Sequence, residues 1–440
     1  MTLLAHQDLQ GRSAYQPVIR KTRRPLDRLR RPSRRQRRSI RSPASAEDNG
    51  TSIVDVTDPR KPRYVAHIPG EPGLGETGGA QMVRVCDGAS CRRAITSKVY
   101  LLRTFGNLAH EIWDVTDPAK PVAASTTVVD KLKGTHKNWW ECDTGIAYLV
   151  SGVAGLAHAP HDAGLRPLRS GAAGVHPQLR PAGPAAGRDR RRCRPDLHGP
   201  ISTGPKGNRV YFGYGTNKDG VLQIVDREKL LAGPQGADRG EPALPAGRHA
   251  SICSRDERRA HHAAGPRHAA RPSSPRTQGG ADARLRDRSS TSQIVNECRE
   301  PRQMVWFVDV TAEAKPFGVV ELQRAREDAA ISARAAGASA RTRPTRTSRR
   351  CTRKRLVFVA WFNAGVRAID IRDPVPPAGG RLLHPGDHRT RPTSAASRLQ
   401  DGKERCKVAI QTNNLEVDDR GYIYIVDRAN TGMHILELNR

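Results

Sequence analysis

The chain lacks long hydrophobic runs. No stretch of roughly eighteen consecutive apolar residues occurs in its 440 residues, so no membrane-spanning helix is expected. The N-terminal sequence MTLLAHQDLQGRSAYQP has neither a basic n-region nor a long apolar h-region, so no signal peptide is expected there. The GxSxG, HExxH, P-loop and Rossmann motifs are also missing. The sequence therefore offers no motif for a serine hydrolase, a zinc protease or a nucleotide-binding enzyme.

The eight cysteines lack a regular spacing. None belongs to a CxxC pair or to another zinc-binding pattern. The cysteine pattern therefore defines no metal site, no disulfide framework and no redox compartment.

Acidic and aromatic residues are scarce in five stretches, residues 11–46, 155–195, 233–290, 324–355 and 380–398. These stretches hold 47 of the 75 Lys and Arg residues but only 12 of the 44 Asp and Glu residues, and Tyr15 is their only aromatic residue. The rest of the chain has 28 basic and 32 acidic residues. The net charge of +31 is thus concentrated in these five stretches.

Two explanations compete for the Arg-rich stretches. Such segments bury too little apolar area to offset chain entropy, so they are expected to be disordered basic arms that could bind polyanions. Alternatively, they result from frameshifts in a GC-rich coding sequence, because translation of such a gene in a wrong reading frame yields mainly Arg, Ala, Pro, Gly and His. We favour the frameshift, since each stretch begins and ends abruptly inside a repeat unit. Either way the stretches are expected as coil, and nucleic-acid binding is not favoured.

Outside these stretches, β-branched and aromatic runs alternate with Gly, Asn, Asp and Pro, which is typical of strands and turns. The phrase IVDVTDPRKP from Ile53 returns as IWDVTDPAKP from Ile112, and FVDVTAEAKP and AIDIRDPVPP follow later. Each carboxylate can accept backbone N–H bonds in a turn while Pro presets φ for a corner. A structural role in turns, rather than catalysis, is predicted for Asp55, Asp58, Asp114, Asp117, Asp226, Asp309, Asp370 and Asp373.

Most of these runs follow another strand-like run, which indicates a four-strand unit of about sixty residues. Seven such units fit the chain, and each is too small to bury its sheet faces alone. We therefore predict an all-β fold in which residues 1–440 form one seven-bladed β-propeller, with some blades incomplete and with disordered Arg-rich insert segments. Residues 2–9 are expected to pair beside residues 434–438, and YQPVI from Tyr15 is expected as the innermost strand of the first blade.

The four acid-tipped phrases resemble the repeats of LVIVD-repeat proteins, a group of bacterial β-propellers of undefined function. The resemblance covers the 254 residues outside the five stretches. It implies a propeller fold and an exported or periplasmic location.

Polar residues cluster where innermost strands are expected, in THKNWWECD, LHGPIS and QTNNLEVDD. In a propeller these positions share one rim of the central channel and can form a ligand site. The predicted ligand-binding residues are His136, His198, Asn413, Asn414 and Glu416. His136 and His198 are also metal candidates, and no cofactor is assigned. By contrast, His110 and Glu111 are expected at an exposed hairpin tip, and the tryptophans of NWW are expected to pack between blades.

The leading hypothesis is a monomeric, non-enzymatic β-propeller scaffold that binds a protein or small ligand at the channel rim. One alternative is a metal-dependent oxidoreductase or hydrolase that uses the rim histidines. Another is polyanion binding through the basic segments, which a steep fall of affinity with salt would reveal. The last is a degraded gene product without function.

Overall fold

The computed structural model describes residues 1–21, 49–72, 78–90, 96–128, 132–133, 135–153, 163–169, 197–214, 221–232, 251–253, 305–310, 313, 317–322, 341–346, 356–361, 365–370, 378–383, 396–398, 404–406, 412–428 and 430–439. Within these residues the protein is rich in strands, and the helices are short: α2 (Gly204–Gly207), α3 (Arg227–Ala232), and the 3-10 turns η1 (Leu9–Gly11) and η3 (Gly88–Ser90). None of the described helices is long and apolar enough to cross a membrane.

The strands form small sheets in which every pairing is antiparallel. Five sheets have four strands. The first comprises β1 (Thr2–Gln7), β26 (Met433–Glu437), β25 (Ile423–Asp427) and β24 (Thr412–Val417). The second comprises β4 (Val83–Asp87), β5 (Val99–Phe105), β6 (Ala109–Asp114) and β7 (Val122–Val128). The third comprises β8 (Leu132–Lys133), β9 (Asn138–Glu141), β10 (Ile146–Val153) and β11 (Ala163–Arg169).

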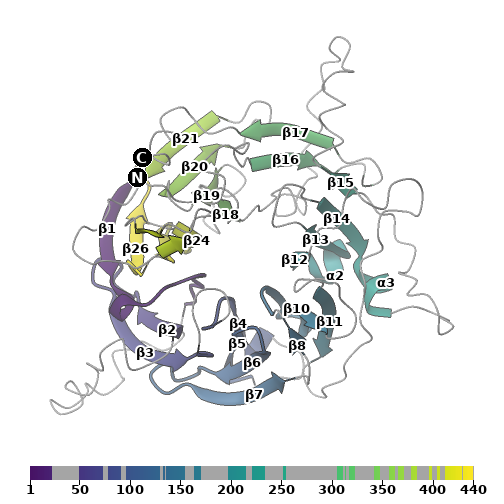
Figure 1. The fold of residues 1–440 in the computed structure, drawn as a ribbon, viewed down its shortest axis with the longest axis horizontal. Coiled ribbons are helices and arrows are strands. Elements are labelled where there is room, and N and C mark those ends of the chain that lie inside the picture. The colour runs from purple at the N-terminus through teal and green to yellow at the C-terminus, as the bar shows by residue number, and fades with distance from the viewer. Residues whose placement is uncertain are drawn as a thin grey trace, which may run out of the picture.

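The fourth four-stranded sheet comprises β12 (Leu197–Ser202), β13 (Arg209–Tyr214), β14 (Val221–Asp226) and β15 (Ser251–Cys253). The fifth comprises β18 (Arg341–Arg346), β19 (Leu356–Trp361), β20 (Gly365–Asp370) and β21 (Ala378–Leu383). Three pairs complete the set: β2 (Gly50–Asp55) with β3 (Arg63–Pro69), β16 (Val305–Asp309) with β17 (Phe317–Leu322), and β22 (Ala396–Arg398) with β23 (Glu404–Cys406). Figure 1 shows the sheets arranged around a common centre, with β4, β12, β18 and β24 nearest to it.

The hydrophobic core lies between the faces of successive sheets. Alternate residues of a strand point to opposite faces, so one strand can serve two neighbours. In β10, Tyr148 packs with Phe212 of the following sheet, whereas Leu149 packs with Leu102 of the preceding one. The same alternation places Ile425 of β25 against β19 and β20, and Tyr424 against β2 and β3. The β8–β11 sheet and the terminal sheet thus each bury two faces by lying between two others.

The two ends of the chain meet in one sheet. Strand β1 pairs antiparallel with β26, with Thr2 opposite Glu437 and Gln7 opposite Met433. The predicted pairing of the N-terminal run beside the last strand is therefore confirmed for Thr2–Gln7. In Figure 1 the two termini lie next to each other, and β1 covers the outer edge of β26. This pairing removes a hydrogen-bonding edge that β26 would otherwise expose.

The expectation that the Arg-rich stretches are coil holds for residues 12–20 but is wrong for other parts that the structure describes. Strand β11 pairs with β10 along seven residues, from Ala163 to Arg169. Likewise β18, whose sequence is RTRPTR, pairs with β19. A strand ladder uses backbone groups, so it can form beside an apolar strand whatever side chains the added strand carries. Residues 251–253, 380–383 and 396–398 are also in strands. Apart from these strands and residues 11–21, the stretches lie outside the described residues.

Two further expectations are wrong. The YQPVI segment is not a strand, because residues 12–20 are neither helical nor extended into a sheet. His110 and Glu111 are not exposed, since they retain only 2% and 8% of their accessible surface. They are buried because β6 is an inner member of its sheet and packs beside β10, where a ring nitrogen of His110 lies 3.2 Å from the Val150 carbonyl oxygen. Burial lowers the pKa of His110 to about 4.

Arginines join neighbouring sheets. Arg103 of β5 is fully buried and pairs with Glu111 at 2.8 Å, while its other nitrogens donate to the carbonyls of Ile68 at 2.9 Å and Pro69 at 2.6 Å in β3. Arg420 of the terminal sheet donates in the same way to the Val56 carbonyl at 3.0 Å. A disulfide between Cys86 of β4 and Cys142, next to β9, joins two further sheets. The cysteine spacing did not indicate this disulfide, because its partners are 56 residues apart and meet only through sheet packing.

Candidate functional site

The corner acids make local turn contacts. Asp55 Oδ1 accepts from the Thr57 backbone N–H at 2.9 Å, and Asp114 Oδ1 accepts from the Thr116 N–H at 3.0 Å. In the following turn Asp58 accepts from the Arg60 N–H at 3.0 Å. Asp117 accepts from the Ala119 N–H at the same distance. These are the contacts of Asx turns, in which a carboxylate replaces a backbone acceptor at a corner.

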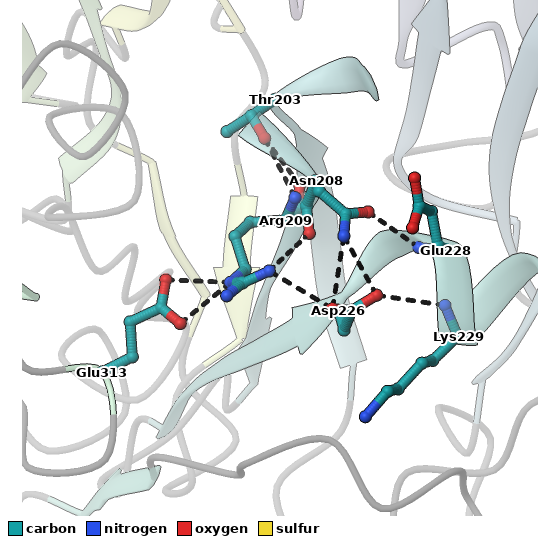
Figure 2. A network of polar contacts seen from close by, with 7 residues as sticks. All are labelled: Thr203, Asn208, Arg209, Asp226, Glu228, Lys229 and Glu313. Atoms are coloured by element: carbon teal, nitrogen blue, oxygen red, sulfur yellow. Dashed lines mark hydrogen bonds and ion pairs between the residues drawn. The ribbon is translucent and has the colours of Figure 1, made fainter. Parts of the chain in front are cut away.

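Asp226 has a wider role, which Figure 2 shows. Its carboxylate accepts from the Lys229 N–H at 3.1 Å and from the Asn208 amide at 3.2 Å, and it pairs with Arg209 at 3.4 Å. Arg209 also pairs with Glu313 at 2.9 Å, which belongs to the turn after β16. This network therefore links the β12–β15 sheet to the β16–β17 pair. Of the other predicted corner acids, Asp309 ends β16 and Asp370 ends β20, and Asp373 lies outside the described residues.

The predicted ligand residues belong to innermost strands or precede them. His136 lies just before β9, and Asn413, Asn414 and Glu416 lie in β24. His198 is in β12, but its side chain lies outside the described part of the structure. Glu416 is further along β24, opposite Tyr424.

Tyr15 brings two of these residues together. The Tyr15 carbonyl accepts from the Asn413 amide at 2.7 Å, and its ring meets the His136 ring edge-on at 5.9 Å between centroids. Lys137 donates to the Tyr15 hydroxyl at 3.3 Å and lies 4.5 Å from the ring centroid. The Arg428 guanidinium lies 5.3 Å from the same centroid. We call Tyr15, Gln81, His136, Lys137, Asn413 and Arg428 the Tyr15 cluster.

Neighbouring elements position the cluster. His136 Nδ1 lies 2.6 Å from Gln81 Oε1, just before β4, so one bond orients the imidazole across two sheets. Asn413 is the extra residue of a β-bulge, since Thr412 pairs with Asp427 while Asn414 pairs with Val426. A bulge re-aims a side chain that regular pairing would hold against the sheet.

Within the part of the chain that the structure describes, several polar atoms on these innermost strands are buried without a hydrogen-bond partner. They are the side-chain oxygens of Thr412, Asn413 and Asn414 and both amide atoms of Asn138. These four residues have at most 1% of their surface exposed. An unpaired buried polar group costs about 1–3 kcal/mol, so a polar ligand or ordered water would offset that cost.

The chemistry available at the cluster is binding chemistry. It combines two cations, an imidazole, amides and a phenol, which suit recognition of an aromatic or polar ligand. Among the described residues, no three His, Cys, Asp or Glu side chains gather where they could hold a metal ion.

Sequence reasoning missed Tyr15, Gln81, Lys137 and Arg428. Tyr15 was assigned to an Arg-rich stretch. It is the only aromatic residue of the five stretches, and that exception could have identified it as a candidate site residue. Lys137 directly follows His136, and that adjacency was a signal that could have found it. The tryptophans of NWW do pack against neighbouring cores, Trp139 on the side of Tyr148 and Trp140 on the side of Leu149.

Comparison with known proteins gives weak likenesses only. No family model matches the chain, and no curated protein matches it. Among solved structures, Chaetomium thermophilum Raptor aligns with a TM-score of 0.38 and 11% identity. The alignment covers 78% of this chain but only 23% of the Raptor chain. The complex of KlAtg21 with the coiled-coil of AgAtg16 gives 0.39 and 10%, covering 80% of each chain. The Cps50 (Swd1) β-propeller domain of Myceliophteria thermophila gives 0.34 and 10%, covering 82% of this chain and 97% of that one. Likenesses of this size assign no function to the chain.

Proposed function

We propose that the protein is a seven-bladed β-propeller of the LVIVD-repeat type, closed by β1 and β26, and that it serves as a non-enzymatic scaffold. Support for seven blades comes from contacts that join seven of the eight described sheets in series; the short β22–β23 pair is not counted as a blade. Cores link β18–β21 to the terminal sheet, the terminal sheet to β2–β3, and β4–β7 through β8–β11 to β12–β15. Arg103 links β2–β3 to β4–β7, and Arg209 links β12–β15 to β16–β17.

The scaffold binds a small ligand or a protein at the inner ends of its blades. The observation that carries this proposal is the Tyr15 cluster. In this cluster His136 and Lys137, next to one sheet, and Asn413 of another sheet all contact Tyr15. Asn413 is 276 or more residues away from the other two in sequence. Such convergence of residues distant in sequence is what a binding site requires.

Thermal denaturation of the full chain with defined probes tests this proposal. The probes are phosphate, citrate, glucuronate, glucose and tyrosine amide, each at millimolar concentration. We expect at least one probe to raise the melting temperature of the wild type and of Lys120→Met, but not of Lys137→Met, because Lys120 is an exposed corner lysine whereas Lys137 is in the cluster. If no probe acts, or if every probe acts equally on both variants, the rim is not the binding site.

The metalloenzyme alternative makes a different prediction. A catalytic metal held by His136 and His198 would be found in stoichiometric amount by elemental analysis and lost in His136→Ala. The scaffold proposal expects the same metal content in His136→Ala and in the wild type. Polyanion binding through the basic stretches would show as heparin affinity that falls steeply between 50 and 200 mM salt.

A further inference from the structure

Residues 12–20, RSAYQPVIR, cross the inner side of the β2–β3 pair. They leave η1 at the end of β1, where the Ala14 N–H donates to the Asp427 carbonyl at 2.9 Å in the terminal sheet. Arg12 donates to the Tyr64 hydroxyl of β3 at 3.1 Å, and at the far end Arg20 pairs with Asp87 of β4. In Figure 1 this purple segment turns from β1 inward to the middle of the ring.

The segment contacts the cluster as a bound peptide would. A tyrosine residue in an extended chain offers a π-face, a hydroxyl and a backbone carbonyl, and here each has a partner. Lys137 and Arg428 lie against the ring, Lys137 donates to the hydroxyl, and Asn413 donates to the carbonyl. Ile19 adds an apolar contact to the core of the terminal sheet. The groups that recognise the segment come from β24, from the turn after β25 and from the residues before β9.

We infer that the members of the cluster other than Tyr15 form a recognition site for an extended, tyrosine-bearing peptide of a partner protein, and that residues 12–20, with Tyr15, occupy it as an intramolecular competitor. This inference rests on the proposed function and names its ligand class. Exchange is feasible because residues 12–20 belong to no helix and no sheet, so no ladder has to be broken to release them. A tethered segment acts at an effective concentration of about millimolar, so it weakens binding of an added peptide in proportion.

The experiment measures binding of fluorescein-labelled RSAYQPVIR to the full chain by fluorescence anisotropy. One variant is Tyr15→Ala, which removes the ring from the tethered segment, and a second is Tyr15→Ala with Ile19→Asp, which also removes its apolar anchor. We expect the peptide to bind the double variant at least about tenfold more tightly than the wild type, because the competitor is gone. The labelled peptide RSAAQPVIR should bind the double variant at least about tenfold more weakly than RSAYQPVIR does.

Two controls locate the binding. Adding Lys137→Met to the double variant should abolish peptide binding, whereas adding Lys120→Met should leave it unchanged. Circular dichroism of each variant shows whether the sheets are retained; if the double variant unfolds, Tyr15→Ala alone provides the comparison. Equal affinity of the peptide for wild type and released variants, or no binding to folded released variants, overturns the inference. If that happens while a small probe still stabilises the wild type but not Lys137→Met, the proposed rim site stands and only the peptide assignment falls.

Discussion

The ion pair between Glu141 and Arg227 should hold two sheets together. Arg227 begins α3, directly after β14 of the β12–β15 sheet, and reaches Glu141 of β9 with bonds of 2.8 Å and 2.7 Å. The same carboxylate accepts from the hydroxyls of Tyr148 at 2.8 Å, Thr144 at 2.6 Å and Ser202. Both side chains are almost fully buried, with 2% exposure for Glu141 and 7% for Arg227. Breaking a buried pair of this kind by removing one partner leaves an uncompensated charge and costs about 3–5 kcal/mol.

The perturbation is Glu141→Gln, which keeps the size of the side chain and removes its charge. The NH2 group of the introduced glutamine would also face a hydrogen-bond donor, because in the wild type both carboxylate oxygens accept from Arg227 and from hydroxyls. We expect the free energy of unfolding, measured by urea titration with tryptophan fluorescence, to fall by about 3–5 kcal/mol. Trp139 and Trp140 precede Glu141 directly, so their emission reports on this region.

A double-mutant cycle separates the pair from its parts. Arg227→Met should cost a similar amount, but Glu141→Gln combined with Arg227→Met should cost at least about 2 kcal/mol less than the two single changes summed. Lys98→Met provides the matched control, because Lys98 pairs with Asp114 at the surface and an exposed pair of this kind contributes little to stability. A loss below about 1 kcal/mol for Glu141→Gln, or strict additivity in the cycle, would refute the reasoning.

Burial would raise the pKa of Glu141, but the bonds from Arg227, Ser202, Thr144 and Tyr148 lower it below its ordinary value. The advantage of the wild type over Glu141→Gln should therefore be complete above about pH 4.3 and shrink as the pH falls through the lowered pKa.

Other predictions follow from single contacts. Replacing Cys86 and Cys142 by serine opens a loop whose ends are 56 residues apart, and loop-closure entropy predicts a loss of about 4 kcal/mol in the urea titration, with no further change on adding reductant. Gly432→Ala should lower the free energy of unfolding by about 1–3 kcal/mol, because Gly432 has φ of 93° and an added Cβ would lie 2.8 Å from the Asp8 Cα and collide with the Gln7 carbonyl. The control is Gly213→Ala, whose Cβ would meet nothing closer than 3.9 Å. Equal effects of the two changes would contradict the placement of β1. Burial depresses the pKa of His110 to about 4, so the stability of the wild type should decline as the pH falls from about 6.5 to 4, by up to roughly 3 kcal/mol, and His110→Leu should remove that decline. If the Arg-rich stretches are frameshifted, translating the coding DNA in the other two frames should restore strand-like sequence there; stop codons or Arg-rich text in both frames would exclude that origin.

The strands and their corners could be predicted from the sequence because both depend on neighbouring residues. A near-continuous apolar run such as YIYIVD indicates a strand buried on both faces, and Asp55 and Asp114 bond to backbone N–H groups only two residues away. The pairing of the N-terminal run with β26 was also accessible, because an unmatched strand at one end and a missing strand at the other leave few alternatives.

Contacts between sheets were decided only by the tertiary structure. The disulfide, the burial of His110 and the pairing of Glu141 with Arg227 each depend on which sheet lies beside which, and no local pattern reports that. The pairing of Arg-rich β11 with β10 was missed because side-chain composition says little about a backbone ladder. The Tyr15 cluster is the extreme case: Tyr15 and Asn413 are 398 residues apart, and they meet because the pairing of β1 with β26 brings the segment after η1 to the terminal sheet.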